Sequence, residues 1–420
     1  ITEILIDMKS ETRMLRLLQG DVGSGKTIVA LMAMLVAVEQ GAQAALMAPT
    51  EILARQHFQT IQKLAPQVGI DILLITGRDK GKRRKQLLER LSSGKAAIAI
   101  GTHALFQDDI NFQDLALIVV DEQHRFGVHQ RLALSAKGQS TEILVMTATP
   151  IPRTLMMTAY GDMETSRLTE KPAGRRPIET RVMPQAKVEE IVDRMRHAIA
   201  IGARIYWVCP LVEDSDTLDI TAATKRHAAL AQSFGERVGL IHGRLKPTQK
   251  DAVMEKFITG KLDILVATTV IEVGVDVPEA TIIVIEQAER FGLAQLHQLR
   301  GRVGRANKKS ACILMYGEPL TQAAAARLKV MRETEDGFVI ADQDLLLRGA
   351  GEVLGTRQSG LPQFKIADPV ADADLVAVAR DDARIFLERD PELKSERGNA
   401  LKTLLYLFER DAVVKTALSG

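Results

Sequence analysis

Short apolar segments alternate with helix-length stretches along this chain, and the alternation occurs twice. The first series of apolar segments comprises residues 14–18, 44–48, 70–75, 96–100, 115–120 and 143–146. The second series comprises residues 205–209, 238–241, 264–267, 281–285 and 312–315. Strands separated by helix-length stretches are typical of βαβ units, in which neighbouring strands run parallel. The pattern predicts an α/β protein with two mostly parallel sheets in tandem.

The chain length and one proline-containing segment indicate how the chain divides. A chain of 420 residues is too long for a single hydrophobic core, so two or more domains are expected. Between the two series, residues 171–177 read KPAGRRP, which indicates a linker. We predict a first domain at residues 1–170, a second at 171–335 and a third part at 336–420, with a helical pattern from residue 368 onward.

The segment GDVGSGKT at residues 20–27 fits the phosphate-loop pattern of a glycine, four free positions and then Gly-Lys-Thr. An apolar segment precedes it and a helix-length stretch follows it, which is the context that the motif requires and which argues against a chance glycine-rich turn. Lys26 is expected to reach the β and γ phosphates of a nucleotide, and the Thr27 hydroxyl to hold Mg²⁺. The other residues expected to bind nucleotide here are Gly20, Gly23, Ser24 and Gly25.

A partner acid follows the continuous apolar run at residues 115–120, which is typical of a strand buried on both faces. Asp121 and Glu122 come directly after it, at the carboxyl edge of the predicted sheet, where open α/β sheets bind ligands. An Asp-Glu pair after a strand is often only a turn. Beside a phosphate loop, we expect Asp121 to hold the Mg²⁺ shell and Glu122 to orient or deprotonate the attacking water.

The segment QLRGRVGR at residues 298–305 places a row of arginines far downstream of the phosphate loop. If the segment is helical, Gln298, Arg302 and Arg305 share one face, and Arg300 lies off that face, where a structural role is expected. A solvated basic helix is the alternative. With nucleotide in a cleft between the two domains, Arg302 and Arg305 could act as fingers on the γ-phosphate.

The remaining residues of this segment are expected to anchor it. Leu296, Leu299 and Val303 line the face opposite to the arginines in a helical arrangement. Gly301 and Gly304 have no side chain, so a phosphate or another part of the backbone could approach closely, at some cost in helix propensity.

Composition limits the classes of function. The net charge is only +2, from 55 basic and 53 acidic residues, so nucleic-acid binding has to come from local patches. Aromatic residues make up 4% of the chain, which argues against a single-strand binder that stacks bases and favours backbone contact.

The cysteines and histidines do not indicate a metal site. Cys209 and Cys312 are the only cysteines and each lies inside an apolar run, which suggests neither a disulfide framework nor a zinc site and fits a reducing compartment. His124 and His129 lack the i, i+4 spacing of zinc sites on helices.

The ends of the chain and its apolar runs indicate no membrane association. The longest apolar run, residues 28–38, is well short of a membrane span, and no signal-peptide pattern opens the chain. Ile1 begins inside an amphipathic helical pattern, so further sequence is expected upstream.

An ordered set of motifs resembles that of the superfamily 2 helicases and translocases: GDVGSGKT, DEQH at 121–124, TAT at 147–149, VATTVIEVGVDVP at 266–278 and QLRGRVGR. The resemblance narrows to the bacterial fork-remodelling helicases of the RecG family. It is carried by APTEILARQH at 48–57, GTHALFQ at 101–107, DEQHRFGVHQR at 121–131, TATPIPRT at 147–154, ERFGLAQLHQLRGRVGR at 289–305 and DLLLRGAGEVLGTRQSG at 344–360.

The transcription-repair coupling factor Mfd shares part of this pattern. It has TATPIPRT, the arginine segment and a similar RGAG segment, but Mfd-like proteins usually read DEEQRFGV and end the later motif in EQHG. This chain has DEQHRFGV and TRQSG, which favours the RecG family. The PriA-type helicases lack much of the later segment.

The resemblance implies two tandem RecA-like domains, a mainly helical C-terminal segment, and ATP-driven translocation on double-stranded DNA that unwinds forks and Holliday junctions. The implied cofactors are ATP and Mg²⁺. The implied partners are double-stranded and branched DNA, together with single-strand-binding protein. A cytoplasmic, nucleoid-associated monomer without membrane contact is the family expectation.

The family's residue roles transfer to the matching positions. Lys26, Thr27, Asp121 and Glu122 keep the roles argued above, and Gln298, Arg302 and Arg305 are implied to sense the γ-phosphate. Nucleotide contact from the second domain is implied for Gly274 and Asp276, domain coupling for Thr147 and Thr149, and DNA backbone contact for Thr50, Arg55, Thr102, His103 and Thr268. Hydroxyls and cations at strand-to-helix turns suit phosphates, although Thr50 and Thr102 could instead only cap helices.

Downstream of the arginine segment, the family has a translocation motif, in which a helical hairpin passes movement to the DNA. Arg327, Arg348 and Gln358 occupy its key polar positions. The alternative is that the glycine-rich stretch at residues 348–357 is only a solvated connection.

Two parts of the family pattern are not in these 420 residues. The glutamine segment that reads adenine lies upstream of the phosphate loop in this family, and the wedge domain that splits branched DNA is N-terminal. The resemblance therefore predicts a motor that hydrolyses ATP weakly and discriminates poorly between branched and linear duplex DNA. An Mfd-like motor acting on RNA polymerase, a non-hydrolysing DNA scaffold and an RNA helicase remain as alternatives.

Overall fold

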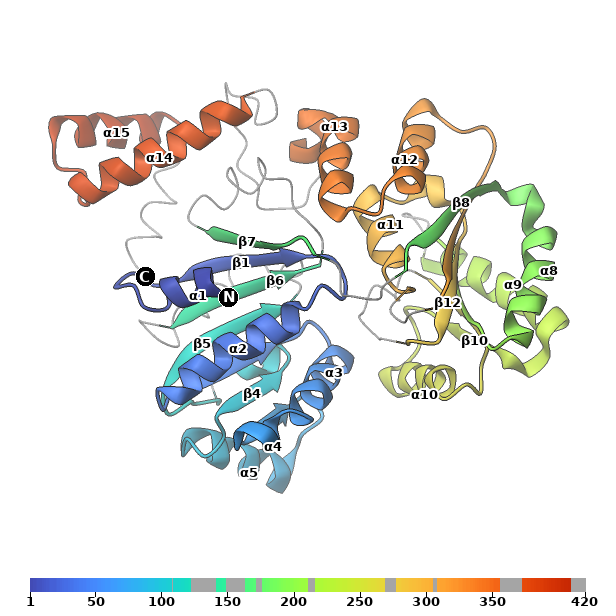
Figure 1. The fold of residues 1–420 in the computed structure, drawn as a ribbon, viewed down its shortest axis with the longest axis horizontal. Helices are drawn as coiled ribbons and strands as arrows, with labels where there is room; N and C mark the ends of the chain where they lie inside the picture. The colour runs from blue at the N-terminus through green and yellow to red at the C-terminus, as the bar shows by residue number, and fades with distance from the viewer. Residues whose placement is uncertain are drawn as a thin grey trace.

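The computed structural model describes residues 1–107, 109–121, 141–148, 163–170, 176–210, 216–268, 277–304, 308–355 and 372–408, apart from the side chains of residues 106, 216–220, 348–355, 373 and 377. Two sheets with their helices lie next to each other in Figure 1; the helices of residues 373–407 lie above the first sheet, and the helix of residues 337–355 lies beside the helices of the second half.

Seven parallel strands form the first sheet in the described part of the chain, in the order β3-β4-β2-β5-β6-β1-β7. They are β1 (Leu15–Gly20), β2 (Gln43–Met47), β3 (Ile72–Ile75), β4 (Ile98–Gly101), β5 (Leu115–Asp121), β6 (Glu142–Thr147) and β7 (Glu164–Leu168). Alternate residues of a strand point to opposite faces. Leu46 and Val119 therefore pack in one core cluster, and Met47 and Val120 pack in another.

The second sheet has six parallel strands among the described residues, in the order β10-β11-β9-β12-β13-β8. They are β8 (Ile178–Pro184), β9 (Arg204–Val208), β10 (Val238–Ile241), β11 (Ile264–Ala267), β12 (Ala280–Ile285) and β13 (Ser310–Tyr316). Two parallel sheets in tandem are what the alternation of apolar segments predicted, so the predicted fold class is confirmed.

Helices cover the sheets on their apolar faces. In the first half they are α1 (Thr2–Asp7), α2 (Lys26–Glu39), α3 (Glu51–Gln62), α4 (Ala65–Val68) and α5 (Gly81–Ser92), with the short 3₁₀ helix η1 (His103–Phe106). In the second half they are α8 (Val188–Ala200), α9 (Asp216–Phe234), α10 (Pro247–Ile258), α11 (Leu293–Arg300) and α12 (Gln322–Glu333), with η3 (Gln185–Lys187), η4 (Gly235–Arg237) and η6 (Ala288–Arg290). Apolar residues of α8 and α9 pack on one face of the second sheet, and those of α10, α11 and α12 pack on the other.

The C-terminal part is helical, as predicted. It comprises α13 (Gly337–Gly355), α14 (Ala373–Arg389) and α15 (Glu396–Leu407). Among the described helices, none combines the length and the apolar character that crossing a membrane requires.

Two edge strands, β7 and β8, were not predicted, because each carries too many polar residues to form an apolar run. The edge strand β7 also contacts the C-terminal helices. Glu164 of β7 pairs with Arg380 and Arg384 of α14 at 2.9 and 3.2 Å, and the Arg167 guanidinium lies 5.0 Å from the centre of the Phe338 ring of α13. The polar character of β7 thus reflects its contacts with another part of the chain.

The second core encloses one carboxylate. Glu286, which follows β12, is only 7% exposed and accepts hydrogen bonds from Trp207 Nε1 and from Arg226 Nε. The Arg226 guanidinium also lies over the Trp207 ring, 5.2 Å from its centre. A buried carboxylate is tolerated when it is paired and hydrogen-bonded, and Glu286 is both.

Both cysteines are buried in this second half. Burial raises the pKa of the Cys312 thiol to about 12, and burial together with the charge of Glu286 raises the pKa of the Cys209 thiol. Because the thiolate is the reactive form, a raised pKa leaves almost none of it near neutral pH.

We therefore expect both thiols to be unreactive toward Ellman's reagent at pH 8 in the folded chain, and both to react after unfolding in guanidinium chloride. The measurement is the absorbance of the released thiolate before and after denaturant. Rapid stoichiometric labelling of either cysteine in the native protein would contradict the burial.

Candidate functional site

The predicted phosphate loop connects the carboxyl end of β1 to the start of α2. Gly23 and Gly25 have φ angles of 80° and 94°, in the left-handed region that favours glycine. The Lys26 ammonium donates hydrogen bonds to the carbonyl oxygens of Gly20 and Asp21 at 2.7 and 2.9 Å. The loop therefore curves around the lysine at the N-terminus of α2, where a helix favours anions.

Two features of this loop fit a bound phosphate. The Ser24 hydroxyl oxygen is buried and has no hydrogen-bond partner among the described residues. A Cβ at Gly20 would lie 2.5 Å from that oxygen, so only glycine fits there. The loop thus combines a backbone that has to stay bare with a buried hydroxyl that can donate to an anion.

Asp121 lies at the same edge of the sheet as the loop. The strand order places β6 between β5 and β1, and the register pairs Asp121 with Met146 and Gln19 with Thr147. Asp121 and Thr147 are 8% and 2% exposed, respectively. The parallel strands therefore bring the phosphate loop, Thr147 and Asp121 to one edge.

The Asp121 carboxylate has a partner that the sequence did not indicate. Its Oδ2 lies 2.8 Å from Nε2 of His57, a buried residue of α3. The oxygen donors of Thr27 and Asp121 are of the kind that Mg²⁺ prefers, so these residues fit the expected ion. Glu122 and Thr149 lie outside the described residues.

The predicted arginine helix is shorter than expected. Helix α11 ends before Gly301, so the condition under which Gln298 and Arg302 would share one helical face is not met. Beyond the end, Arg302 N donates to Leu299 O at 3.0 Å, which is a tight turn, and Gly304 has a φ of 74°. The cap residue Gly301 keeps right-handed angles, so α11 ends in this turn, and Gly304 lies three residues beyond the cap.

The apolar side of the segment is as predicted, because Leu296, Leu299 and Val303 are fully buried. Gln298 and Arg302 are also buried, at 9% and 7% exposure. The alternative of a solvated basic helix is therefore wrong for this part of the segment. Arg305, Gly274 and Asp276 lie outside the described residues.

Arg300 has the structural role that was predicted for it. It is 2% exposed, and its Nη1 donates to the carbonyl oxygens of Met331 and Thr334, at 2.7 and 2.9 Å, at the end of α12. Its Nη2 contacts His297 Nδ1 at 3.3 Å. Arg300 thus joins α11 to the C-terminal end of α12.

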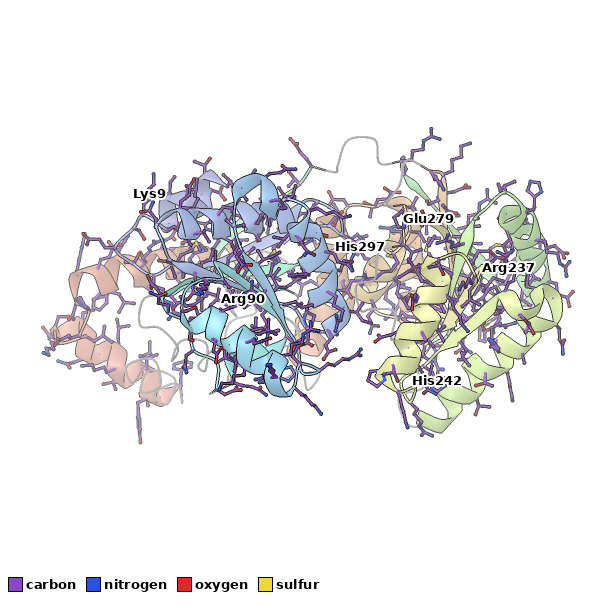
Figure 2. All side chains as sticks on the ribbon, turned by 90° about the horizontal axis from the view of Figure 1, so that it is seen from below. Lys9, Arg90, Arg237, His242, Glu279 and His297 are labelled. Carbon is purple, nitrogen blue, oxygen red and sulfur yellow. The ribbon has the colours of Figure 1, made fainter. Side chains whose placement is uncertain are left out.

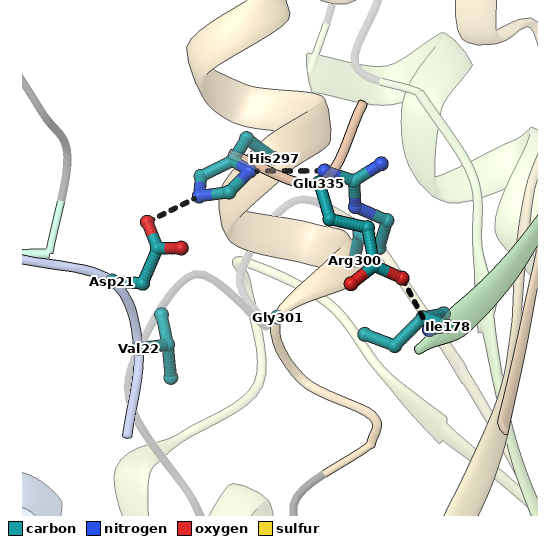
Figure 3. A pocket seen from close by; sticks show the side chains of 7 residues that line it. All are labelled: Asp21, Val22, Ile178, His297, Arg300, Gly301 and Glu335. Carbon is teal, nitrogen blue, oxygen red and sulfur yellow. Dashed lines mark hydrogen bonds and ion pairs between the residues drawn. The ribbon is translucent and has the colours of Figure 1, made fainter. Parts of the chain in front are cut away.

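The phosphate loop and α11 meet across the space between the two sheets. Figure 2 shows His297 at this junction, and Figure 3 shows its ring between Asp21 and Arg300. His297 Nε2 lies 3.1 Å from Asp21 Oδ1. A narrow cavity of about 20 Å³ lies here, lined by Asp21, Val22, Ile178, His297, Arg300, Gly301 and Glu335.

Gly301 and Gly304 permit close approach, as expected, but the groups that approach them are side chains of the protein itself. A Cβ at Gly301 would lie 3.1 Å from Val22 Cγ2 of the phosphate loop, and a Cβ at Gly304 would lie 2.7 Å from Ile178 Cγ1 of β8. Gly301 therefore lets the phosphate loop contact the second half of the molecule.

A second contact between the halves lies away from the loop. Arg78, which follows β3, pairs through Nε with Glu51 of α3 at 2.7 Å and through Nη1 with Asp251 of α10 at 2.9 Å. These exposed pairs contribute little to stability by themselves.

The predicted DNA contacts in the first half lie at adjacent strand ends. Thr50 follows β2 and Thr102 follows β4, and these strands are neighbours in the sheet. The Thr50 hydroxyl caps α3 by accepting from Leu53 N at 3.4 Å, whereas Thr102 is buried and makes no side-chain cap. Arg55 and His103 are exposed.

The other predicted DNA and coupling residues are only partly described. Thr268 follows β11 and is 1% exposed, and its hydroxyl has no hydrogen-bond partner among the described residues. Arg327 of α12 donates from Nη2 to Glu289 O at 2.8 Å, which holds α12 against η6. Arg348 belongs to α13, but its side chain is outside the description, as is all of Gln358.

Three family models match the chain. They are the DEAD/DEAH box helicase at residues 3–158, the helicase conserved C-terminal domain at 186–307, and the C-terminal part of domain 3 of the ATP-dependent DNA helicase RecG at 334–418. The third model is specific to RecG, which disfavours the Mfd alternative.

Individual RecG proteins are similar to this chain, in agreement with the family models. The chain is 51% identical to the ATP-dependent DNA helicase RecG of Escherichia coli O157:H7 over 398 residues, 93% of this chain and 57% of that protein. It is 48% identical to the RecG of Synechocystis sp. over 98% of this chain and 49% of that protein.

The chain belongs to the RecG helicase family. A solved structure of RecG bound to a three-way DNA junction is 42% identical, with a TM-score of 0.74, and the match covers 89% of this chain and 49% of that one. The family resemblance in the motifs is thereby confirmed. The chain spans 57% and 49% of the two curated RecG proteins compared here.

His57 and His297 are functional candidates in this RecG-family chain that the motifs did not single out. Both occur inside motifs, LARQH and LAQLHQLR, in which Arg55 and Gln298 are the residues with an implied role. No spacing rule pairs His57 with Asp121 or His297 with Asp21, because each pair is distant in sequence and close only in the fold.

The contact between Gly301 and Val22 yields a prediction. We expect Gly301→Ala to lower the ATP turnover number about fivefold, since slight overpacking of a tight contact costs about 1 kcal/mol. Adding Val22→Ala should restore much of the loss, because the smaller side chain makes room for the new methyl group.

The measurement is steady-state ATP hydrolysis for the two single variants and the double variant. Gly243→Ala serves as a control, because a Cβ at that position would meet nothing within 4 Å. Equal losses in Gly301→Ala and the double variant would contradict a contact through these two residues.

Proposed function

We propose that this chain is the motor of an ATP-dependent DNA helicase and translocase that remodels branched DNA, such as stalled forks and Holliday junctions. The observation that carries the proposal is the junction between the phosphate loop and α11, where Asp21 and His297 are 3.1 Å apart. A nucleotide held on that loop lies beside the point where the two halves touch. A change at the nucleotide can therefore alter how the halves pack.

The residues of the first half divide the work of hydrolysis. Lys26 at the start of α2 would bind the β and γ phosphates of ATP, with the backbone of Gly20, Gly23, Ser24 and Gly25 around them. Thr27 and Asp121 would hold Mg²⁺, which neutralises developing phosphate charge when it is bound. Glu122 would orient the attacking water.

The second half would complete the site. Gln298, Arg302 and Arg305 would approach the γ-phosphate, and Gly274 and Asp276 would contact the nucleotide, as the family motifs imply. The burial of Gln298 in α11 and of Arg302 just beyond it supports this proposal. In this scheme residues 1–170 and 171–335 are the two RecA-like domains, and residues 336–420 transmit their movement.

Double-stranded DNA would run along the strand ends that carry Thr50, Arg55, Thr102, His103 and Thr268. The hydroxyls suit phosphate oxygens, and their strand-end position supports backbone contact without base readout. Thr147 and Thr149 would couple the domains. Arg327, Arg348 and Gln358 would pass the movement to the duplex.

Two further family properties extend this proposal. A monomer is expected, which sedimentation velocity would measure. Single-strand-binding protein is an expected partner. This chain and that partner would act at the nucleoid, where the DNA substrate is.

The proposal is tested by the ATPase rate of the 420-residue chain on fork, Holliday junction, linear duplex and RNA. Duplex DNA should stimulate hydrolysis, with little preference for branched substrates, because the family's wedge domain is outside these residues. Lys26→Ala should abolish the stimulated rate.

Each alternative has its own outcome in this assay. RNA as the better activator would favour an RNA helicase, and no hydrolysis with saturating DNA would favour a scaffold. A strong preference for forks would contradict the expected loss of discrimination. Retention of RNA polymerase by the chain in a pull-down would favour an Mfd-like motor.

A second test concerns the arginine finger. We expect Arg305→Ala to lower turnover by a factor on the order of 10³ while nucleotide binding changes little, because a finger arginine acts mainly on transition-state charge. Binding of a fluorescent ADP analogue and single-turnover hydrolysis separate the two effects. Parallel losses in binding and turnover would contradict the finger role.

A further inference from the structure

His57 and Asp121 are 64 residues apart in the sequence, and both are buried. The distance between Nε2 and Oδ2 is 2.8 Å, and the two residues are 9% and 8% exposed. His57 is on the second turn of α3, and Asp121 is the last residue of β5. The contact therefore joins a helix to a strand end at the predicted nucleotide edge.

The chemistry of the two side chains fixes which of them donates the hydrogen bond. An ionised carboxylate only accepts hydrogen bonds, so with Asp121 ionised Nε2 of His57 carries the proton and donates it to Oδ2. This bond occupies one carboxylate oxygen and sets the plane of the group. The other oxygen stays available for the hydrated shell of a metal ion.

The histidine is held firmly by its helix. Leu53, Ala54 and Ile61 of α3 are all buried in the first core cluster, so the helix that carries His57 cannot easily shift relative to the sheet. A ring on such a helix is a rigid support, and rigid partners of ligating groups are what orient them.

We propose that His57 is a positioning residue that holds the Asp121 carboxylate in the orientation that receives the Mg²⁺ of the bound nucleotide. The proposal rests on the proposed function, because it assigns Asp121 to Mg²⁺. A merely structural role would instead make His57 matter for stability alone.

The test compares two polar, uncharged replacements of His57. The amide nitrogen of Gln can occupy nearly the same place as Nε2, whereas the amide nitrogen of Asn corresponds to Nδ1 and cannot reach Oδ2. We expect His57→Asn to raise the Mg²⁺ concentration for half-maximal binding of a fluorescent ADP analogue about tenfold, as loss of a partner behind a ligand typically does. His57→Gln should restore most of the affinity.

Ile61→Ala is the control, because Ile61 is buried on the same helix and the change removes packing without touching Asp121. It should lower the Tm and leave the Mg²⁺ requirement unchanged. An unchanged Mg²⁺ requirement in His57→Asn, or equal shifts in the Asn and Gln variants, would overturn the proposal. If His57→Asn does not fold, a wild-type Mg²⁺ requirement in His57→Ala overturns the proposal, and a tenfold higher one supports it.

The result for the wild-type chain separates this proposal from the proposed function. Binding of the ADP analogue that does not depend on Mg²⁺ in the wild type would contradict the proposed ATPase site itself. Mg²⁺-dependent binding in the wild type with no effect of His57→Asn would contradict only the role of His57.

Discussion

The parallel direction of every strand pair in the two sheets is the constraint on which the site depends. Parallel strands end at the same edge, so loops from distant parts of the sequence meet there without any special arrangement. In the first sheet, β6 lies between β1 and β5, and this order brings the phosphate loop, Thr147 and Asp121 together. The order depends on the apolar strands being buried on both faces, which the clusters on the two sides of the sheet provide.

The second requirement is contact between the halves. It is made at the phosphate loop by His297 on Asp21, and by the bare backbone of Gly301 against Val22. Arg300 continues the contact from α11 to the end of α12. The loop that is expected to bind nucleotide thus touches a helix that is fastened to the C-terminal end of α12.

Much of the fold was readable from local pattern. Buried strands of a parallel sheet form continuous apolar runs, and eleven such runs were found at strands β1 to β6 and β9 to β13. The strands β7 and β8 carry polar residues between their apolar ones, and so they escaped the pattern, whereas the strands at the opposite edges of the two sheets, β3 and β10, are apolar and were found. The end of α11 also escaped it. Amphipathic spacing continues through residue 305, but the helix ends at Arg300 and the backbone goes on as tight turns, in which Arg302 N donates to Leu299 O and Val303 N to Arg300 O.

The sequence by itself determined which residues are expected to carry the nucleotide chemistry. A glycine-rich loop before a helix, an acid after an apolar run and the RecG motifs all depend on residues that are close together in the chain. Only the tertiary structure decided which side chains support that chemistry. His57 contacts Asp121, and His297 contacts Asp21, across sequence separations that no local pattern can report. The physical reason is that the orientation of a buried polar group is set by whatever donor the packing of other elements brings within hydrogen-bond distance.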